Sequence, residues 1–178
     1  MRSFFVGLLL FVFLVPSAVA ADPQQLGRCF LLASRVYKVD PYLLLAVAYV
    51  ESSLRQEAVN YNRNGTVDLG IMQINSCWSS RIRNWRLVKD SACFNVLVGA
   101  WVLRQCIDTY GLNWDAVSCY NTGRGLRELS GSRRLKAELY VYRVYKTLRA
   151  LKARTKGVGQ TAYQALSVPA ARCQCPGL

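Results

Sequence analysis

One glutamate directly follows a strongly apolar segment. Residues 43–50 read Leu-Leu-Leu-Ala-Val-Ala-Tyr-Val, and Glu51 comes next. A helix over this segment is apolar on every face and must be buried all round. A carboxyl at its end, one turn beyond Val47, loses solvation, which disfavours the charged form and raises its pKa. Glu51 is therefore a candidate general acid near neutral pH. The alternative is that Glu51 turns to solvent or forms an ion pair with an arginine such as Arg55.

The elements that must position Glu51 are mostly helices. Asp40-Pro41 is an N-cap followed by a proline at the first helical position, which predicts a helix from there to about Ser52. Helical spacing predicts further helices over residues 24–38, 90–110, 113–121 and 132–154. Asn64-Gly65, inside the polar stretch 60–68, suits a tight hairpin turn. We expect a mainly α single domain with a small β-hairpin region, without internal repeats or linkers.

The amino-acid composition excludes several kinds of active site. The chain has 178 residues, of which 52% are hydrophobic, and it has no histidine. This is enough apolar material for the core of one domain. Without histidine, a Ser-His-Asp triad, a Cys-His pair and a histidine-ligated metal are all excluded. We expect no metal and no cofactor.

The first twenty residues have the three parts of a secretory signal. Arg2 precedes an apolar run from Phe4 to Val15, and the small-residue pattern Ala18-Val19-Ala20 follows Pro16. Twelve apolar residues are fewer than the roughly 20 that span a bilayer, so we expect cleavage after Ala20 rather than an anchor. The domain is then expected at residues 21–155 and a short tail at 156–178, with no membrane-spanning segment. The mature chain would carry 22 basic against 10 acidic residues, a net charge of +12.

All of the cysteines lie beyond this signal, which fits an oxidising compartment in which disulfides persist. They are Cys29, Cys77, Cys93, Cys106, Cys119, Cys173 and Cys175. Because seven is odd, one thiol is free or intermolecular. A metal cluster is disfavoured, since the only close pair has one intervening residue and no second pair accompanies it.

Three short motifs occur in a fixed order. They are Glu51-Ser52, the string Gly-Ile-Met-Gln-Ile-Asn at 70–75, and Tyr-Asn-Thr-Gly at 120–123. Together they resemble the core motifs of soluble-lytic-transglycosylase domains in the lysozyme superfamily. The likeness is greatest to the small transglycosylases that accompany secretion, conjugation and pilus systems in Gram-negative bacteria, over about residues 26–125. Tyr140-Val141 resembles the later Tyr-Val motif of the family. The resemblance implies a lysozyme-like α+β fold and an exported, periplasmic protein.

The resemblance also implies a reaction on peptidoglycan. Glu51 would protonate the leaving oxygen between N-acetylmuramic acid (MurNAc) and N-acetylglucosamine (GlcNAc), then act as base while the muramic 6-hydroxyl closes a 1,6-anhydro ring. Substrate contacts are expected from Ser52, Met72, Gln73, Asn75, Tyr120, Asn121 and Tyr140. For Met72 the alternative is packing in the core.

Asp68 favours a second mechanism. The stretch 62–78 also resembles C-type animal lysozymes, in which the corresponding aspartate is the second carboxylate, so hydrolysis by Glu51 and Asp68 is the alternative reaction. Asp68 could instead satisfy backbone amides of its own turn. On the transglycosylase interpretation it is an auxiliary group that stabilises positive charge.

The same loop has partial calcium-loop spacing at Asn60, Asn62, Asn64 and Gly65. The twelfth position would be Ile71 rather than a bidentate glutamate, so calcium is not expected.

The family likeness further implies a disulfide between Cys29 and Cys93, since related secretion-associated enzymes often carry cysteines at these positions. Pairing of Cys77 with Cys93, as in C-type lysozymes, is the alternative.

Basic residues concentrate late in the chain. Between residues 133 and 156 there are nine Lys or Arg residues and a single acidic residue, Glu138. This cationic helix is either a solvated face or a surface that attracts stem-peptide carboxylates, anionic lipid headgroups or a subunit of a secretion or conjugation machine. No motif supports nucleic-acid binding. A non-enzymatic wall-binding or scaffold protein is the remaining alternative.

Overall fold

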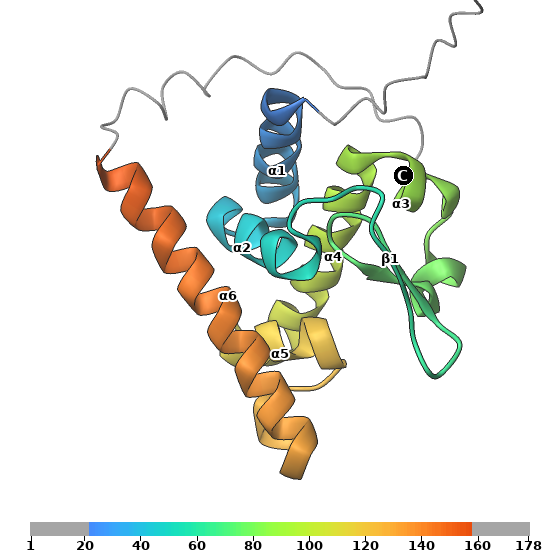
Figure 1. Ribbon diagram of the computed structural model, residues 1–178, viewed down its shortest axis with the longest axis vertical. Helices are drawn as coiled ribbons and strands as arrows, with labels where there is room; N and C mark the ends of the chain where they lie inside the picture. The colour runs from blue at the N-terminus through green and yellow to red at the C-terminus, as the bar shows by residue number, and fades with distance from the viewer. Residues whose placement is uncertain (1–21, 158–178) are drawn as a thin grey trace, which may run out of the picture.

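The computed structural model describes residues 22–157, so the expected signal at 1–20 and nearly all of the expected tail lie outside the described residues (Figure 1). The helices are α1 (Pro23–Tyr37), α2 (Pro41–Ser52), α3 (Arg86–Asp90), α4 (Ala92–Tyr110), α5 (Trp114–Thr122) and α6 (Gly131–Gly157). Two short 3-10 helices, η1 (Ser76–Arg81) and η2 (Leu126–Glu128), connect them. The prediction of a mainly α domain is confirmed. None of the helices within this part of the chain is long and apolar enough to cross a membrane.

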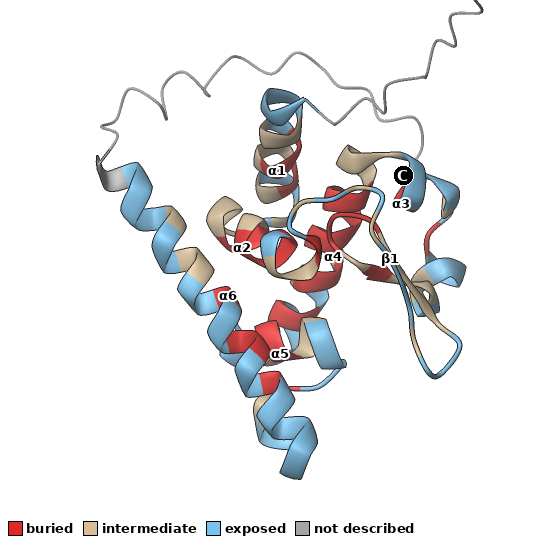
Figure 2. Ribbon diagram, viewed as in Figure 1, coloured by how far each residue is buried: buried red, intermediate tan, exposed pale blue. Residues whose placement is uncertain are grey.

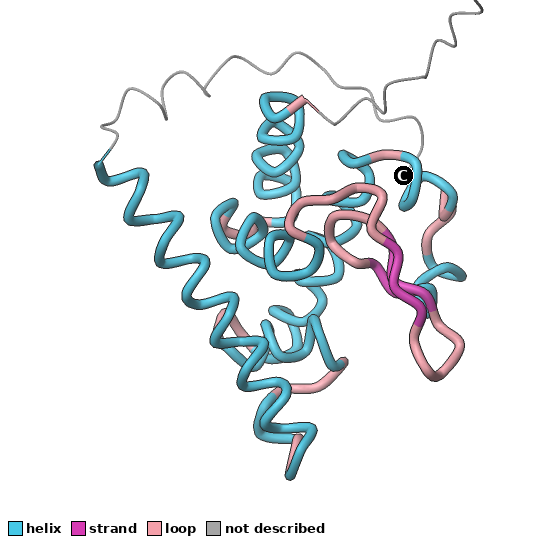
Figure 3. The backbone as a smooth tube through the Cα atoms, in the orientation of Figure 1, coloured by secondary structure: helices cyan, strands magenta, loops and turns pink. Residues whose placement is uncertain are grey.

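Three short strands form an antiparallel sheet at one side of the helices (Figure 3). They are β1 (Val59–Tyr61), β2 (Val67–Leu69) and β3 (Ile74–Asn75), in the order β1-β2-β3. The predicted hairpin turn lies between β1 and β2, where Gly65 has a φ of 81°. The third strand was not predicted, because two residues are too few to show an alternating pattern.

The core is built around α2 and α4 (Figure 2). The α2 side chains of Leu44, Val47 and Ala48 are completely buried, but the prediction that this helix is buried on every face is wrong, because Tyr49 is 53% exposed. The predicted start of α2 is confirmed: the Asp40 carboxylate caps the helix by accepting a hydrogen bond from the Tyr42 amide at 2.8 Å, and Pro41 is the first helical residue. The helix ends at Ser52, and the φ of 56° at the following Ser53 turns the chain toward the sheet. This turn leaves Glu51 in the last turn of α2.

The string 70–75 is anchored to α4 by a buried asparagine. The Asn95 side-chain oxygen accepts a hydrogen bond from the Met72 amide at 2.7 Å, and its nitrogen donates to the carbonyls of Leu69 and Val88, each at 2.8 Å. A Cβ at Gly70 would lie 2.2 Å from this nitrogen, so only glycine fits there. Asn95 therefore fixes the loop that follows β2.

Two disulfides connect the helices. Cys29 of α1 is bonded to Cys93 of α4, the pair that the family resemblance implies. A second bond, between Cys106 of α4 and Cys119 of α5, was not predicted. Cys77 is an exposed free thiol and so does not form the alternative pair with Cys93. Cys173 and Cys175 lie outside the described residues.

Candidate active site

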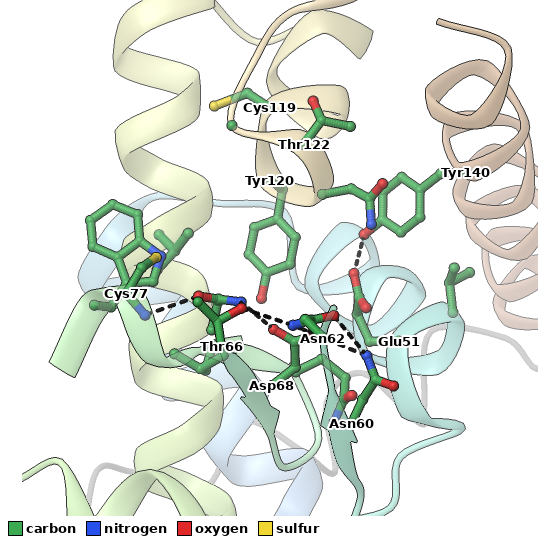
Figure 4. A pocket seen from close by; sticks show the side chains of 18 of the residues that line it. Glu51, Asn60, Asn62, Thr66, Asp68, Cys77, Cys119, Tyr120, Thr122 and Tyr140 are labelled. Carbon is green, nitrogen blue, oxygen red and sulfur yellow. Dashed lines mark hydrogen bonds between the residues drawn. The ribbon is translucent and has the colours of Figure 1, made fainter. Parts of the chain in front are cut away.

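A cleft of about 1400 Å³ lies where the end of α2, the sheet, α4, α5 and α6 meet. Figure 4 shows that its polar side chains come from both walls: Glu51 and the sheet on one, and Tyr120 and Tyr140 on the other. Gln73, Asn75 and Asn121 also line it, as predicted for substrate contacts. Five of the expected substrate-binding residues thus meet Glu51 and Asp68 in one cavity.

Glu51 is the partly buried acid of this cleft. Burial raises its pKa to about 7, a hydrogen bond from Tyr140 opposes this rise, and the negative charge of Asp68 adds to it. The Tyr140 hydroxyl donates to Glu51 Oε1 at 2.6 Å. The pairing of Glu51 with Arg55 does not occur: Arg55 Nε instead donates to the Ser52 carbonyl at 3.0 Å. The predicted rise in the pKa of Glu51 is therefore confirmed.

Asp68 lies on β2 and is held by three side-chain amides. Asn60 and Asn62 donate to its Oδ2 at 3.1 and 2.8 Å, and Asn75 donates to its Oδ1 at 2.7 Å. Sheet register explains this arrangement, since Asn60 of β1 and Asn75 of β3 are the strand partners of Asp68. The interpretation in which Asp68 satisfies backbone amides of its own turn is wrong, because the groups that donate to it are the side-chain amides of Asn60, Asn62 and Asn75.

Two tyrosines join the helical wall to the rest of the site. Tyr120 of α5 donates to the Met72 carbonyl at 2.7 Å, which ties α5 to the loop after β2. Tyr140 of α6 ties that helix to α2 through Glu51. Burial, together with the negative charge of Glu51, raises the pKa of both phenols well above the ordinary value, so both stay protonated hydrogen-bond donors.

Two predicted substrate contacts need correction. The Met72 side chain is fully buried and packs on α4, where a Cβ at Gly99 would lie 2.6 Å from it. Ser52 is also buried, and its hydroxyl donates to the Ile71 carbonyl at 2.8 Å. Neither side chain lines the cleft, because both are used to fix the loop 70–75 against the helices.

Further residues of the site were not predicted from the sequence. Arg143 lines the cleft and its guanidinium lies 5.9 Å from the centre of the Tyr140 ring. Its position three residues after Tyr140 on a helix was the available signal, since residues so spaced share a face. Asn60 of β1 and Asn62, which directly follows that strand, both contact Asp68, whereas the sequence suggested for them only a calcium loop.

A partly buried glutamate at the junction of a helical domain and a small sheet is typical of a lysozyme-like domain. Comparison with known families identifies it more closely: residues 28–139 match the family described as "Transglycosylase SLT domain". The chain belongs to this family, whose members are lytic transglycosylases, and is an enzyme of that class.

Curated relatives agree with this assignment. Invasion protein IagB of Salmonella typhi is 33% identical over 129 residues, covering 70% of this chain and 77% of that protein. The X polypeptide of Escherichia coli is 33% identical over 132 residues, covering 72% and 78%. Protein IpgF of Shigella flexneri is 36% identical over 127 residues, covering 68% and 82%.

Proposed function

We propose that the protein cuts the β-1,4 bond between MurNAc and GlcNAc in peptidoglycan and leaves 1,6-anhydroMurNAc ends. The observation that carries this proposal is Glu51, with its pKa of about 7, in a cleft lined with amides and hydroxyls. A general acid works best when its pKa is near the working pH. The cleft also exceeds the roughly 300–1000 Å³ of small-molecule pockets, which suits a polymeric substrate.

The hydrogen bond from Tyr140 decides which oxygen of Glu51 carries the proton. Oε1 accepts from the phenol, so in the neutral carboxyl the proton belongs on Oε2. Within the described residues, Oε2 has no hydrogen-bond partner. Oε2 can therefore donate to the glycosidic oxygen as the bond to the anomeric carbon breaks.

In the second step Glu51 acts as a base. Its carboxylate accepts the proton of the MurNAc 6-hydroxyl as O6 bonds to the anomeric carbon, so Glu51 is protonated again while the proton that it gave earlier stays on the 4-hydroxyl of the GlcNAc product. Asp68 supports the positive charge at the anomeric carbon without bonding to it. The three amides that bind its two oxygens restrain it in this auxiliary role.

Hydrolysis at the same bond is the second candidate. It is favoured by Asp68, which lies near enough to Glu51 for its charge to raise the pKa of the acid. In that reaction Asp68 would bond to the anomeric carbon or stabilise it while water attacks. The amide hydrogen bonds at both of its oxygens make Asp68 a weaker nucleophile, which is why we prefer ring closure.

Mass spectrometry of fragments released from purified sacculi tests the proposal. Anhydro ends lack the molecule of water that hydrolysed ends contain, and we expect anhydro ends from the wild type. Glu51→Gln keeps the shape of the side chain but cannot donate the proton, so release should fall by about 10²-fold or more. Predominantly reducing ends would assign hydrolysis instead. Normal release by a folded Glu51→Gln protein would rule out Glu51 as the acid, whereas no release by the folded wild type would leave the non-enzymatic wall-binding or scaffold alternative.

We further propose that the protein is exported to the periplasm after removal of residues 1–20 and opens the wall locally for a secretion, conjugation or pilus apparatus. The two disulfides fit an oxidising compartment. IagB is named an invasion protein, which supports a role beside such an apparatus. Cell fractionation with N-terminal sequencing tests both export and the cleavage site. A product that keeps Met1 in the cytoplasm would contradict this part of the proposal.

A further inference from the structure

The exposed apolar side chains of the protein gather on and beside α6. Within the described residues, six of the eleven large exposed hydrophobic side chains lie there: Leu112, Trp114, Leu135, Leu139, Tyr142 and Tyr145. Figure 2 shows α6 along one edge of the molecule, with its inner side buried and its outer side exposed. Exposed apolar side chains are ordinary when scattered, but a cluster indicates a contact surface.

The outer side of α6 carries one continuous row of side chains, here called the outer row: Leu135, Leu139, Tyr142, Lys146 and Arg149. Successive members are four, three, four and three residues apart, so they share one helical face. Leu135, Leu139 and Tyr142 are 58%, 55% and 55% exposed. The core face of the same helix, with Ala137, Val141 and Val144, lies opposite. None of the outer row lines the cleft.

Basic charge surrounds this row and is largely unbalanced. Of the basic residues on α6, Arg134 forms an ion pair with Glu138 and Lys152 with Asp40. Within the described part of the chain, no carboxylate oxygen lies within 4.0 Å of Lys136, Arg143 or Lys146. The Lys146 ammonium lies 5.6 Å from the centre of the Tyr142 ring, so an apolar and a cationic group are presented side by side.

Two aromatic side chains extend the surface toward α5. Trp114 and Tyr145 contact each other edge to face, with their ring centres 5.6 Å apart. They are 39% and 37% exposed, and Leu112 beside them is 75% exposed. Tryptophan and tyrosine suit the boundary between lipid headgroups and acyl chains because their rings are amphipathic.

We propose that the outer row is a docking surface for an anionic lipid bilayer, on which α6 lies flat with Leu135, Leu139 and Tyr142 between the headgroups. A helix with apolar residues on one face and Lys and Arg around them binds such surfaces through buried apolar area and charge. Lys146 and Arg149 reach phosphates from their long stems. This inference goes beyond the proposed function and does not depend on it.

The outer row is poorly suited to bind a helix of another protein or a second copy of this chain. A coiled-coil partner requires apolar residues along the whole row, and Lys146 and Arg149 would have to be buried in it. A second copy of this chain would place one cationic α6 against another. Lipid headgroups remove both difficulties, because they offer phosphate oxygens where the row becomes basic.

Vesicle co-sedimentation of residues 21–178, which include the whole described domain, tests the proposal. We expect binding to vesicles of phosphatidylcholine mixed with phosphatidylglycerol, little binding to pure phosphatidylcholine, and weakening by salt. Each basic residue near such a surface contributes about fivefold, so Lys146→Gln with Arg149→Gln should weaken binding about 25-fold. The matched control, Arg83→Gln with Lys89→Gln, removes the same charge from another surface and should change binding by less than about twofold.

A second pair of variants tests the apolar contact. Leu139→Ser with Tyr142→Ser should weaken binding by about tenfold or more at constant net charge. Leu87→Ser with Tyr61→Ser removes the same two exposed side-chain types elsewhere and should leave binding unchanged. Circular dichroism of every variant establishes that it is folded.

Three outcomes would overturn the proposal. The first is no binding to the mixed vesicles, which would leave the row for a protein partner. The second is an equal loss of binding in the outer-row variants and their controls, which would reduce the interaction to net charge. The third is a lipid-free dimer in sedimentation equilibrium that Leu139→Ser with Tyr142→Ser dissociates, which would assign the row to a second copy.

Discussion

Glu51→Gln should make the folded protein more stable at neutral and alkaline pH. The folded pKa of Glu51 is about 7 against an ordinary value of 4.5, so folding opposes its ionisation. Below pH 4.5 the carboxyl is protonated in both the folded and the unfolded chain, so it does not lower the free energy of unfolding. As pH rises from 4.5 to 7, the unfolded chain releases the proton first, and the free energy of unfolding falls. Above pH 7 the loss in the free energy of unfolding is complete. It is about 3 kcal/mol, because each unit of difference between the folded and the ordinary pKa of Glu51 contributes about 1.36 kcal/mol.

The substitution removes this cost because the amide does not titrate and its oxygen can still accept from Tyr140. Urea unfolding followed by circular dichroism at a series of pH values from acid to alkaline measures the difference. We expect the variant and the wild type to agree near pH 4 apart from a constant offset, and the variant to gain up to about 3 kcal/mol by pH 8. Glu57→Gln, which removes an exposed carboxyl from the same cleft, is the matched control. A gain that does not grow with pH would refute the reasoning.

Other predictions concern the neighbours of Glu51. Tyr140→Phe removes the hydrogen bond that lowers the pKa of Glu51, so the alkaline limb of the pH–rate profile should move up by about one pH unit; an unmoved limb would contradict the assignment of the acid. Asp68→Asn should slow cleavage by about 10–10²-fold while the mass of the glycan ends stays the same, and a change from anhydro to reducing ends would count against an auxiliary role. Replacing Cys106 and Cys119 by serine removes a disulfide and should lower the free energy of unfolding by about 2–4 kcal/mol, as measured by urea titration. The replacement should also slow turnover in the release assay, because both residues line the cleft. Unchanged turnover would show that this bond does not help to shape the site.

Local sequence signals were sufficient to predict α2 and the raised pKa of its glutamate. The N-cap Asp40, the proline after it and the apolar run are all adjacent in sequence, so one segment specifies where the helix begins, that much of it is buried and where Glu51 lies. The rise in the pKa of Glu51 follows from burial, which the run itself indicates. Neither inference required knowledge of a distant residue.

The partners of the buried asparagine could not be predicted in this way. Asn95 lies in an apolar helix, and its partners at Leu69, Met72 and Val88 belong to segments that are distant in sequence or precede the helix. For the same reason the sequence did not show that Met72 packs in the core, where its side chain contacts Gly99 on α4, rather than binding substrate. A hydrophobic pattern shows that a side chain is buried but does not name the group that it contacts.

The two carboxyl groups differ in their surroundings, and this difference supports their separate roles. Glu51 ends a helix whose apolar composition removes water, and its one hydrogen bond engages only Oε1. Asp68 lies on β2 between Asn60 of β1 and Asn75 of β3, and both of its oxygens accept hydrogen bonds from side-chain amides. A proton donor needs a raised pKa and a free oxygen, whereas a group that supports positive charge needs a fixed position. In the proposed reaction the helix provides the acid and the sheet provides the fixed charge, so we expect the exchange Glu51→Asp with Asp68→Glu to abolish the release of fragments from sacculi even though both carboxyl groups would still be present.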